Sequence, residues 1–184
     1  MFKLLFNPGK FYKEIARTIH LSPILIAVRW IATGSLVTLP LWLNAAVPFN
    51  TPWLPIPQET YYFWQLVFIL PYGVFITLVL TGLSLLILKG GGKPSTRFRA
   101  ALVIVSYSLF LPWIACLFWD VFCIFSGHWS FAWVVPVHIA AVLVEGFLYA
   151  FGVRRVFGAS WGRAVLIAII NCIVFIGLSA LIIR

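Results

Sequence analysis

The chain has 184 residues, of which 63% are hydrophobic and only 9% are charged. A soluble globular domain carries about 45–50% apolar and about 25% charged residues, so this composition excludes a soluble protein and predicts an integral membrane protein. The basic excess, 13 Lys and Arg against 4 Asp and Glu, would by number alone fit a nucleic-acid-binding protein. The positions of these charges along the chain indicate a membrane surface instead.

The N-terminal segment, residues 1–21, is predicted to form a cytoplasmic amphipathic helix. Asn7 followed by Pro8 is typical of a helix start, because Asn caps a helix and Pro fits its first turn. Apolar residues then recur at every fourth position from Phe11 to Ile19, which places them on one face. We expect this face to lie in the lipid boundary, and a helix that binds a protein partner is the alternative.

Five apolar segments follow, and each has about the 20 residues that a helix needs to cross a bilayer. The predicted spans are residues 22–43, 62–88, 100–122, 132–153 and 164–183. The first connection contains four prolines, which prevent a helix there. The predicted fold class is therefore all-α, with one domain over residues 22–184 formed by a bundle of five transmembrane helices.

The second predicted span carries a bend and a packing face. Pro71 predicts a kink, because proline interrupts the backbone hydrogen bonds of a helix. Gly73, Thr77 and Thr81 recur at every fourth residue and form a face of small side chains. Such a face lets a neighbouring helix approach closely.

The connection after the second span reads KGGGKPSTRFR, residues 89–99. It lacks the phosphate-loop pattern G-x-x-x-x-G-K-[ST], because Pro94 follows Lys93, and no strand precedes it. We therefore predict a flexible basic loop and no nucleotide site.

Basic residues gather in segments that five crossings would place on one side of the membrane. The N-terminal segment and the second-to-third and fourth-to-fifth connections hold four, four and three of the 13 Lys and Arg residues, and the other two connections hold none. The positive-inside rule therefore predicts a cytoplasmic N-terminus and an outside C-terminus, with no nucleic acid as partner. The side chains expected at anionic lipid headgroups or at a partner protein are Lys10, Lys13, Arg17, Lys89, Lys93, Arg97, Arg99, Arg154, Arg155 and Arg163.

Polar groups inside the spans are costly and mark candidate sites. Counted from the cytoplasmic edge at about 1.5 Å per residue, they form one layer through all five spans. Its predicted members are Arg29, Thr81, Tyr107, Glu145 and Asn171. A buried Arg29–Glu145 pair is the structural interpretation, and a proton- or ligand-binding site is the functional one. An Arg29 that faces lipid and reaches toward the headgroups is a third.

Asp120 lies near the outer end of the third span, on one face with Cys116 and Cys123, and His128 and His138 follow in sequence. These side-chain types can ligate zinc, but no C-x-x-C or H-E-x-x-H spacing is present. We therefore predict no metal and no cofactor. Asp120 is expected to meet interfacial water or a backbone donor.

No hydrolase, intramembrane protease or metalloprotease motif is present, so no enzyme is predicted. His138 and Glu145 are seven residues apart and share a helix face. A helix–helix hydrogen bond is the expected role of these two side chains, and a proton relay is the alternative.

Three stretches together resemble the Yip-domain family of Ypt/Rab-interacting membrane proteins: LFNPGKFYKEI (5–15), GGGKPSTRFRAALVIVSYSLFLP (90–112) and FGASWGRAVLIAII (157–170). The resemblance implies a polytopic, non-enzymatic protein with five spans and a cytoplasmic N-terminus. In eukaryotic members the role is membrane trafficking with Rab-type GTPases. The chain lacks their long N-terminal cytosolic region, which puts a Rab-type partner in doubt, and it looks more like short prokaryotic members. The expected location is the cytoplasmic (inner) membrane of a bacterium or archaeon.

The predicted function is a membrane scaffold or adaptor that touches anionic lipid or a partner protein, with self-association or membership of a larger membrane complex. The alternative is a transporter or permease component that uses the polar site around Glu145.

Overall fold

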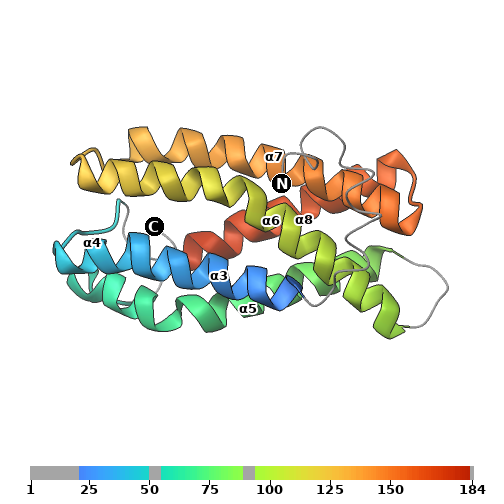
Figure 1. The fold of residues 1–184 in the computed structure, drawn as a ribbon, viewed down its shortest axis with the longest axis horizontal. Coiled ribbons are helices and arrows are strands. Elements are labelled where there is room, and N and C mark those ends of the chain that lie inside the picture. Colours follow the sequence, from blue (N-terminus) through green and yellow to red (C-terminus); the bar gives the residue numbers. More distant parts are fainter. Residues whose placement is uncertain (1–20, 50–54, 89–93, 183–184) are drawn as a thin grey trace.

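The computed structural model describes residues 21–49, 55–88 and 94–182, and every regular element in these ranges is helical (Figure 1). In chain order the elements are α3 (Ser22–Thr33), the π-helical turn η2 (Gly34–Thr38), α4 (Leu39–Leu43), the 3-10 turn η3 (Gln58–Thr60), α5 (Tyr61–Ile87), α6 (Pro94–Phe125), α7 (Phe131–Phe157) and α8 (Trp161–Ile182). The predicted N-terminal amphipathic helix lies outside the described residues.

Five helical segments are long and apolar enough to cross a membrane. They are Ser22–Leu43, Gln58–Ile87, Thr96–Phe125, Phe131–Phe157 and Trp161–Ala180. Large apolar side chains lie on their outer faces; Phe118 is 72% exposed and Leu143 is 70% exposed, as contact with lipid requires. The five predicted spans are confirmed, and the chain is an all-helical integral membrane protein.

Three helices extend further into the basic connections than predicted. α6 begins at Pro94 rather than at residue 100, α7 continues to Phe157 rather than ending at residue 153, and α8 begins at Trp161 rather than at residue 164. The prediction followed only the apolar residues, whereas Arg continues a helix readily beyond them. The two segments predicted as basic loops, 89–99 and 154–163, are therefore helical in part.

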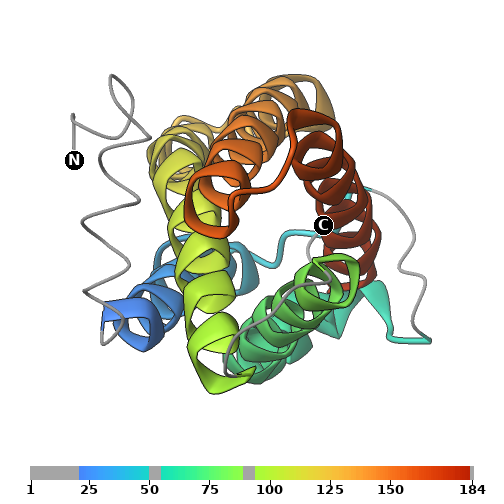
Figure 2. The same cartoon turned by 90° about the vertical axis from the view of Figure 1, so that its right-hand side faces the viewer.

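The helices surround a common interior, which Figure 2 shows end-on. α6 packs against α3, α5 and α7, α7 against α8, and α5 against α3 and α8. Figure 1 shows that α8 ends before the end of the bundle that α4, α5, α6 and α7 reach. Toward that end, the interior of the bundle is therefore surrounded by four spans rather than five.

Trp30 forms the close contact between α3 and α5. Its side chain is 1% exposed, and a Cβ atom added at Gly73 would lie 2.2 Å from the Trp30 ring. Thr77 and Thr81 continue the buried face, and each donates its hydroxyl to the carbonyl four residues earlier, at 2.8 and 2.7 Å. The small-residue face predicted on α5 thus points inward and receives an indole ring.

Two of the spans are irregular where they contain proline. α6 bends in its middle (Figure 1), and it contains Pro112, which cannot donate a hydrogen bond to the preceding turn. The π-helical turn η2 directly precedes α4, whose second residue is Pro40. α5, in contrast, stays one helix through Pro71.

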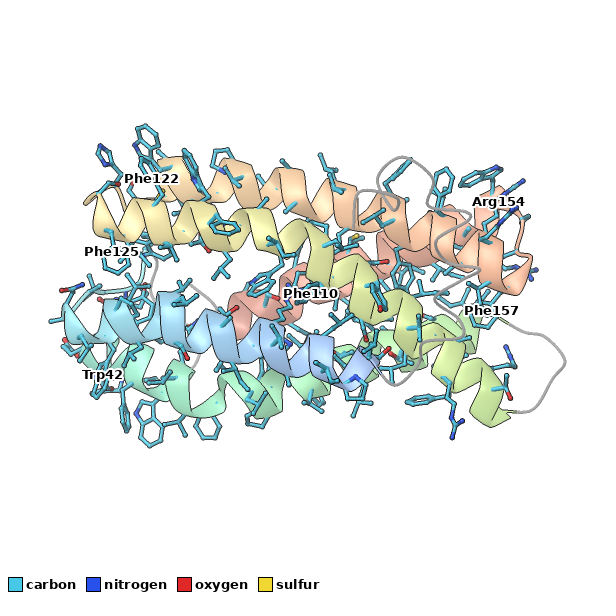
Figure 3. The ribbon with its side chains drawn as sticks, viewed as in Figure 1. Trp42, Phe110, Phe122, Phe125, Arg154 and Phe157 are labelled. Atoms are coloured by element: carbon cyan, nitrogen blue, oxygen red, sulfur yellow. The ribbon has the colours of Figure 1, made fainter. Side chains whose placement is uncertain are left out.

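The two ends of the bundle differ in composition. Apart from Arg29, all described Lys and Arg residues lie where α5 and α7 end and α6 and α8 begin, here called the arginine end: Arg97, Arg99, Arg154, Arg155 and Arg163. Trp42, Phe122 and Phe125 lie at the opposite end, here called the aromatic end, as Figure 3 shows.

Candidate polar site inside the membrane

Arg29 of α3 and Glu145 of α7 lie together in the bundle interior. Arg29 Nη1 is 3.9 Å from Glu145 Oε1, and the two side chains are only 10% and 8% exposed. At this distance the contact is an ion pair and not a hydrogen bond. The structure therefore brings together the two opposite charges of the predicted layer, and Arg29 does not face lipid.

The bend of α6 supplies the hydrogen bond that Arg29 needs. Arg29 Nη1 donates to the backbone carbonyl of Leu109 at 2.5 Å, three residues before Pro112. The guanidinium carbon also lies 5.1 Å from the ring centre of Trp30 and 5.3 Å from that of Phe175, within cation–π range. Arg29 thus contacts residues of three other helices, α6, α7 and α8, as well as its neighbour Trp30 on α3.

Asn171 belongs to a second group of polar side chains nearby. Its Nδ2 donates to Ser84 Oγ at 3.0 Å, and Ser84 Oγ also forms a hydrogen bond with the Tyr149 hydroxyl. Asn171 and Glu145 both line a small cavity of about 10 Å³, which has room for about one water molecule. The two groups therefore form one polar region that joins α5, α7 and α8.

Sequence reasoning did not single out Ser84 or Tyr149. Ser84 lies three residues after Thr81, and Tyr149 lies four residues after Glu145, so both share a helix face with a predicted member. Helical spacing from those members was the signal that could have found them.

The other two predicted members take less central places. The Thr81 hydroxyl is used on its own helix, by the bond to the Thr77 carbonyl. Tyr107 is half-buried on α6, two residues before Leu109, and two residues along a helix turn a side chain by about 200°. It therefore leaves α6 on nearly the opposite side from Leu109.

Asp120 of α6 pairs with His138 of α7, a contact that the sequence did not predict. Asp120 Oδ2 lies 3.3 Å from His138 Nε2, in place of the expected water or backbone donor. His138 was expected to take part in a contact between helices, and its partner is Asp120 on α6, a helix that packs closely against α7. Within the described ranges, no three His, Cys, Asp or Glu side chains gather as metal ligands would.

The histidine geometry fixes one proton at this pair. His138 Nδ1 lies 3.0 Å from the Val134 carbonyl, which can only accept, so Nδ1 carries a hydrogen. A carboxylate oxygen and a bare Nε2 would both be acceptors. The contact therefore holds one proton between Asp120 and His138, on either partner.

A cavity of about 680 Å³ opens between these pairs and the aromatic end. Along α3, η2 and α4 its lining extends from Arg29 to Leu41, roughly 18 Å at the helical rise. Phe49 and Trp129 line it at the aromatic end, and the last turns of α8 line it where that helix stops short. This volume is in the range of small-molecule sites, about 300–1,000 Å³.

Several buried polar atoms of residues that line this cavity have no hydrogen-bond partner among the described residues. They include the acceptors Asp120 Oδ1 and Gln65 Oε1, the donor Arg29 Nε and the hydroxyl of Ser179. Buried polar groups without partners are uncommon in folded proteins, so their concentration at one cavity marks it as a candidate site.

The arginine end is held in place by its own contacts. Arg97 donates from Nη2 to the carbonyl of Leu88, just past the end of α5, and Arg154 stacks on the ring of Trp161 at 4.4 Å. Arg99, Arg155 and Arg163 are exposed. The remaining predicted headgroup contacts lie outside the described residues: Lys10, Lys13, Arg17, Lys89 and Lys93.

The fold and its polar interior define a five-span integral membrane protein with a cavity inside the helix bundle. No family model matches the chain, and searches of curated proteins and of solved structures gave no match. The resemblance to the Yip-domain family therefore stays a prediction.

Proposed function

We propose that the chain is a non-enzymatic membrane scaffold or adaptor of the Yip-domain type, with its N-terminus in the cytoplasm of a bacterium or archaeon and its C-terminus outside. The observation that carries this proposal is the one-sided placement of arginine, because every described Lys or Arg apart from Arg29 lies at the arginine end. Such an end faces the cytoplasm by the positive-inside rule. There it meets anionic headgroups, or an acidic surface of a partner or a second copy.

The contacts at this end support a surface of fixed shape. Arg97 is hydrogen-bonded to the Leu88 carbonyl and Arg154 is stacked on Trp161, so the start of α6 is joined to the end of α5 and the end of α7 to the start of α8. Arg99, Arg155 and Arg163 project from these segments and are exposed. A preorganised set of cations binds anions with less loss of conformational entropy than a flexible one.

Lipid selectivity in nanodiscs tests the proposal. We expect the full-length protein, in phosphatidylcholine discs with a minor share of phosphatidylglycerol, to retain phosphatidylglycerol in native mass spectrometry. The exposed arginines are replaced together, as Arg99→Gln, Arg155→Gln and Arg163→Gln, and this variant should lose the selectivity. Glu59→Gln and His128→Gln at the opposite end serve as the matched control. Equal retention in all variants would overturn the proposal for lipid, and cross-linking of native membranes with the same variants examines a protein partner.

A transporter or permease component is the second candidate, and the cavity favours it. This space reaches Arg29 from the aromatic end, so an ionisable residue in the middle of the bundle lines a site open to a ligand. Flux of a substrate in proteoliposomes that is lost in Glu145→Gln would favour this candidate over a pure scaffold.

A further inference from the structure

The cavity next to Arg29 has a lining that suits a large apolar ligand with a positive charge. Aromatic residues from different elements line it, among them Tyr62 of α5, Trp113 of α6, Phe131 of α7 and Phe175 of α8. Aromatic faces carry negative electrostatic potential and attract cations, most strongly where water is excluded. Among the described residues, the lining contains no lysine and one arginine, Arg29.

That arginine is already compensated. Arg29 Nη1 donates to the Leu109 carbonyl at 2.5 Å and lies 3.9 Å from Glu145 Oε1. Its guanidinium is also within 5.1 Å and 5.3 Å of two aromatic ring centres. A ligand anion would therefore compete with a carboxylate that is part of the fold, although Arg29 Nε has no hydrogen-bond partner in the described part of the chain.

The carboxylate of Asp120 is compensated differently, by a proton. The Asp120–His138 contact holds one proton, and the second carboxylate oxygen, Oδ1, has no partner among the described residues. Gln65 Oε1, an acceptor on the facing helix α5, has none either. A cation can take the place of that proton without leaving net charge in the membrane interior, whereas an anion cannot.

We propose that this cavity binds a lipophilic organic cation, with Asp120 as its counter-charge and the aromatic residues as its walls. Each bound cation releases the proton held between Asp120 and His138, and His138 keeps its Nδ1 hydrogen on the Val134 carbonyl. The titratable groups that interact with Asp120 are His138 of α7 and Cys116 and Cys123 of α6. Arg29 of α3 and Glu145 of α7 lie one step further away, next to Cys116. This site goes beyond the scaffold role and does not depend on it.

Equilibrium dialysis of the full-length protein in a neutral detergent tests the site, with tetraphenylphosphonium as the probe. We expect saturable binding of one cation per chain, quenching of tryptophan fluorescence, and release of about one proton per cation in weakly buffered solution. Tetraphenylborate, an anion of the same shape, should not compete. Equally tight binding of tetraphenylborate would overturn the proposal and indicate an anion site or an unselective apolar cavity.

Variants distinguish binding of the cation at Asp120 from nonspecific binding to apolar surfaces. Asp120→Asn should weaken tetraphenylphosphonium binding by about tenfold or more, because it removes the counter-charge. Glu59→Gln, an exposed carboxylate outside the cavity, should leave binding unchanged. Gln65→Glu adds a negative charge to the facing wall and should tighten binding, which keeps the test informative if Asp120→Asn does not fold. The proposal would be rejected if Asp120→Asn or Gln65→Glu bound tetraphenylphosphonium with the affinity of the wild type. It would also be rejected if the cavity held a phospholipid that tetraphenylphosphonium does not displace.

Discussion

At the scale of single residues, opposite charges and a close ring contact hold the interior together. Arg29 has an ion-pair partner at 3.9 Å, a carbonyl acceptor at 2.5 Å and two aromatic rings, so its charge is stabilised from several helices at once. Residue spacing predicted that Arg29 and Glu145 occur at similar depth. It could not predict the Leu109 carbonyl, because that acceptor depends on the bend of α6.

The Arg29–Glu145 pair should behave as one energetic unit. Removing either partner leaves a buried charge without its counter-charge, so Arg29→Met and Glu145→Gln are each expected to lower the free energy of unfolding by about 3–5 kcal/mol. The double variant should cost less than the sum of the two, with a coupling of about 0.5–3 kcal/mol. Unfolding in mixed micelles with increasing sodium dodecyl sulfate measures all four proteins. Additive costs would mean that the two side chains do not interact.

Gly73 should be intolerant of a single methyl group. A Cβ there would lie 2.2 Å from the buried Trp30 ring, so the ring or the α5 backbone would have to shift. Gly73→Ala is therefore expected to destabilise the protein by about 1–3 kcal/mol. Gly82→Ala on the same helix is the matched control, because a Cβ there meets nothing within 4 Å. Thermal unfolding in detergent should show a loss for the first variant only, and equal midpoints would contradict the Trp30 contact.

At the scale of elements, the ends of the helices at the aromatic end are set by backbone geometry. After α6, Gly127 has φ +74°, and the amides of Gly127 and His128 donate to the carbonyls of Ile124 and Cys123. After α4, Ala45 has φ +50° with the equivalent bonds to Trp42 and Leu41. Both are Schellman turns, and glycine is the residue that they favour. The second turn was not predictable, since alanine gives no signal for it.

These two turns predict opposite effects of exchanging glycine and alanine. Ala45→Gly relieves a strained left-handed residue and should raise the free energy of unfolding by about 1 kcal/mol. Gly127→Ala introduces the same strain and should lower it by a similar amount. Both sites are at helix ends, so each variant controls for the other in one denaturation series. A loss of stability in Ala45→Gly would show that chain flexibility outweighs the strain.

Helix number was readable from the sequence, while helix ends and cross-helix pairs were not. A stretch of about 20 apolar residues defines a span whatever its partners, so all five were found. Arg97 lies in the first turn of α6 and Arg154 in the last turn of α7, and both turns lie outside the apolar stretches from which the spans were predicted. The Asp120–His138 contact depends on the relative rotation of α6 and α7, which no local pattern encodes.

At the scale of the whole molecule, the arginine end and the cavity lie on opposite sides of the Arg29–Glu145 pair. The described arginines of this end lie at the start of α6, the end of α7 and the start of α8, while the cavity lies toward the other end of the bundle, where α8 stops short. If the arginine end faces the cytoplasm, the cavity reaches the polar pair from the outer side. The orientation of the chain therefore decides which compartment supplies a ligand.

Reporter fusions at two positions determine this orientation. Alkaline phosphatase, which is active only outside the cytoplasm, should be active when fused after Arg184, and green fluorescent protein there should stay dark. Inserted in the α7–α8 connection at Ala159, the two reporters should give the reverse result, because that connection lies at the arginine end. A variant with Arg154→Gln, Arg155→Gln and Arg163→Gln should weaken this preference, since the basic residues and not the net charge set it. Phosphatase activity at Ala159 in the unaltered protein would reverse the orientation and place the cavity on the cytoplasmic side.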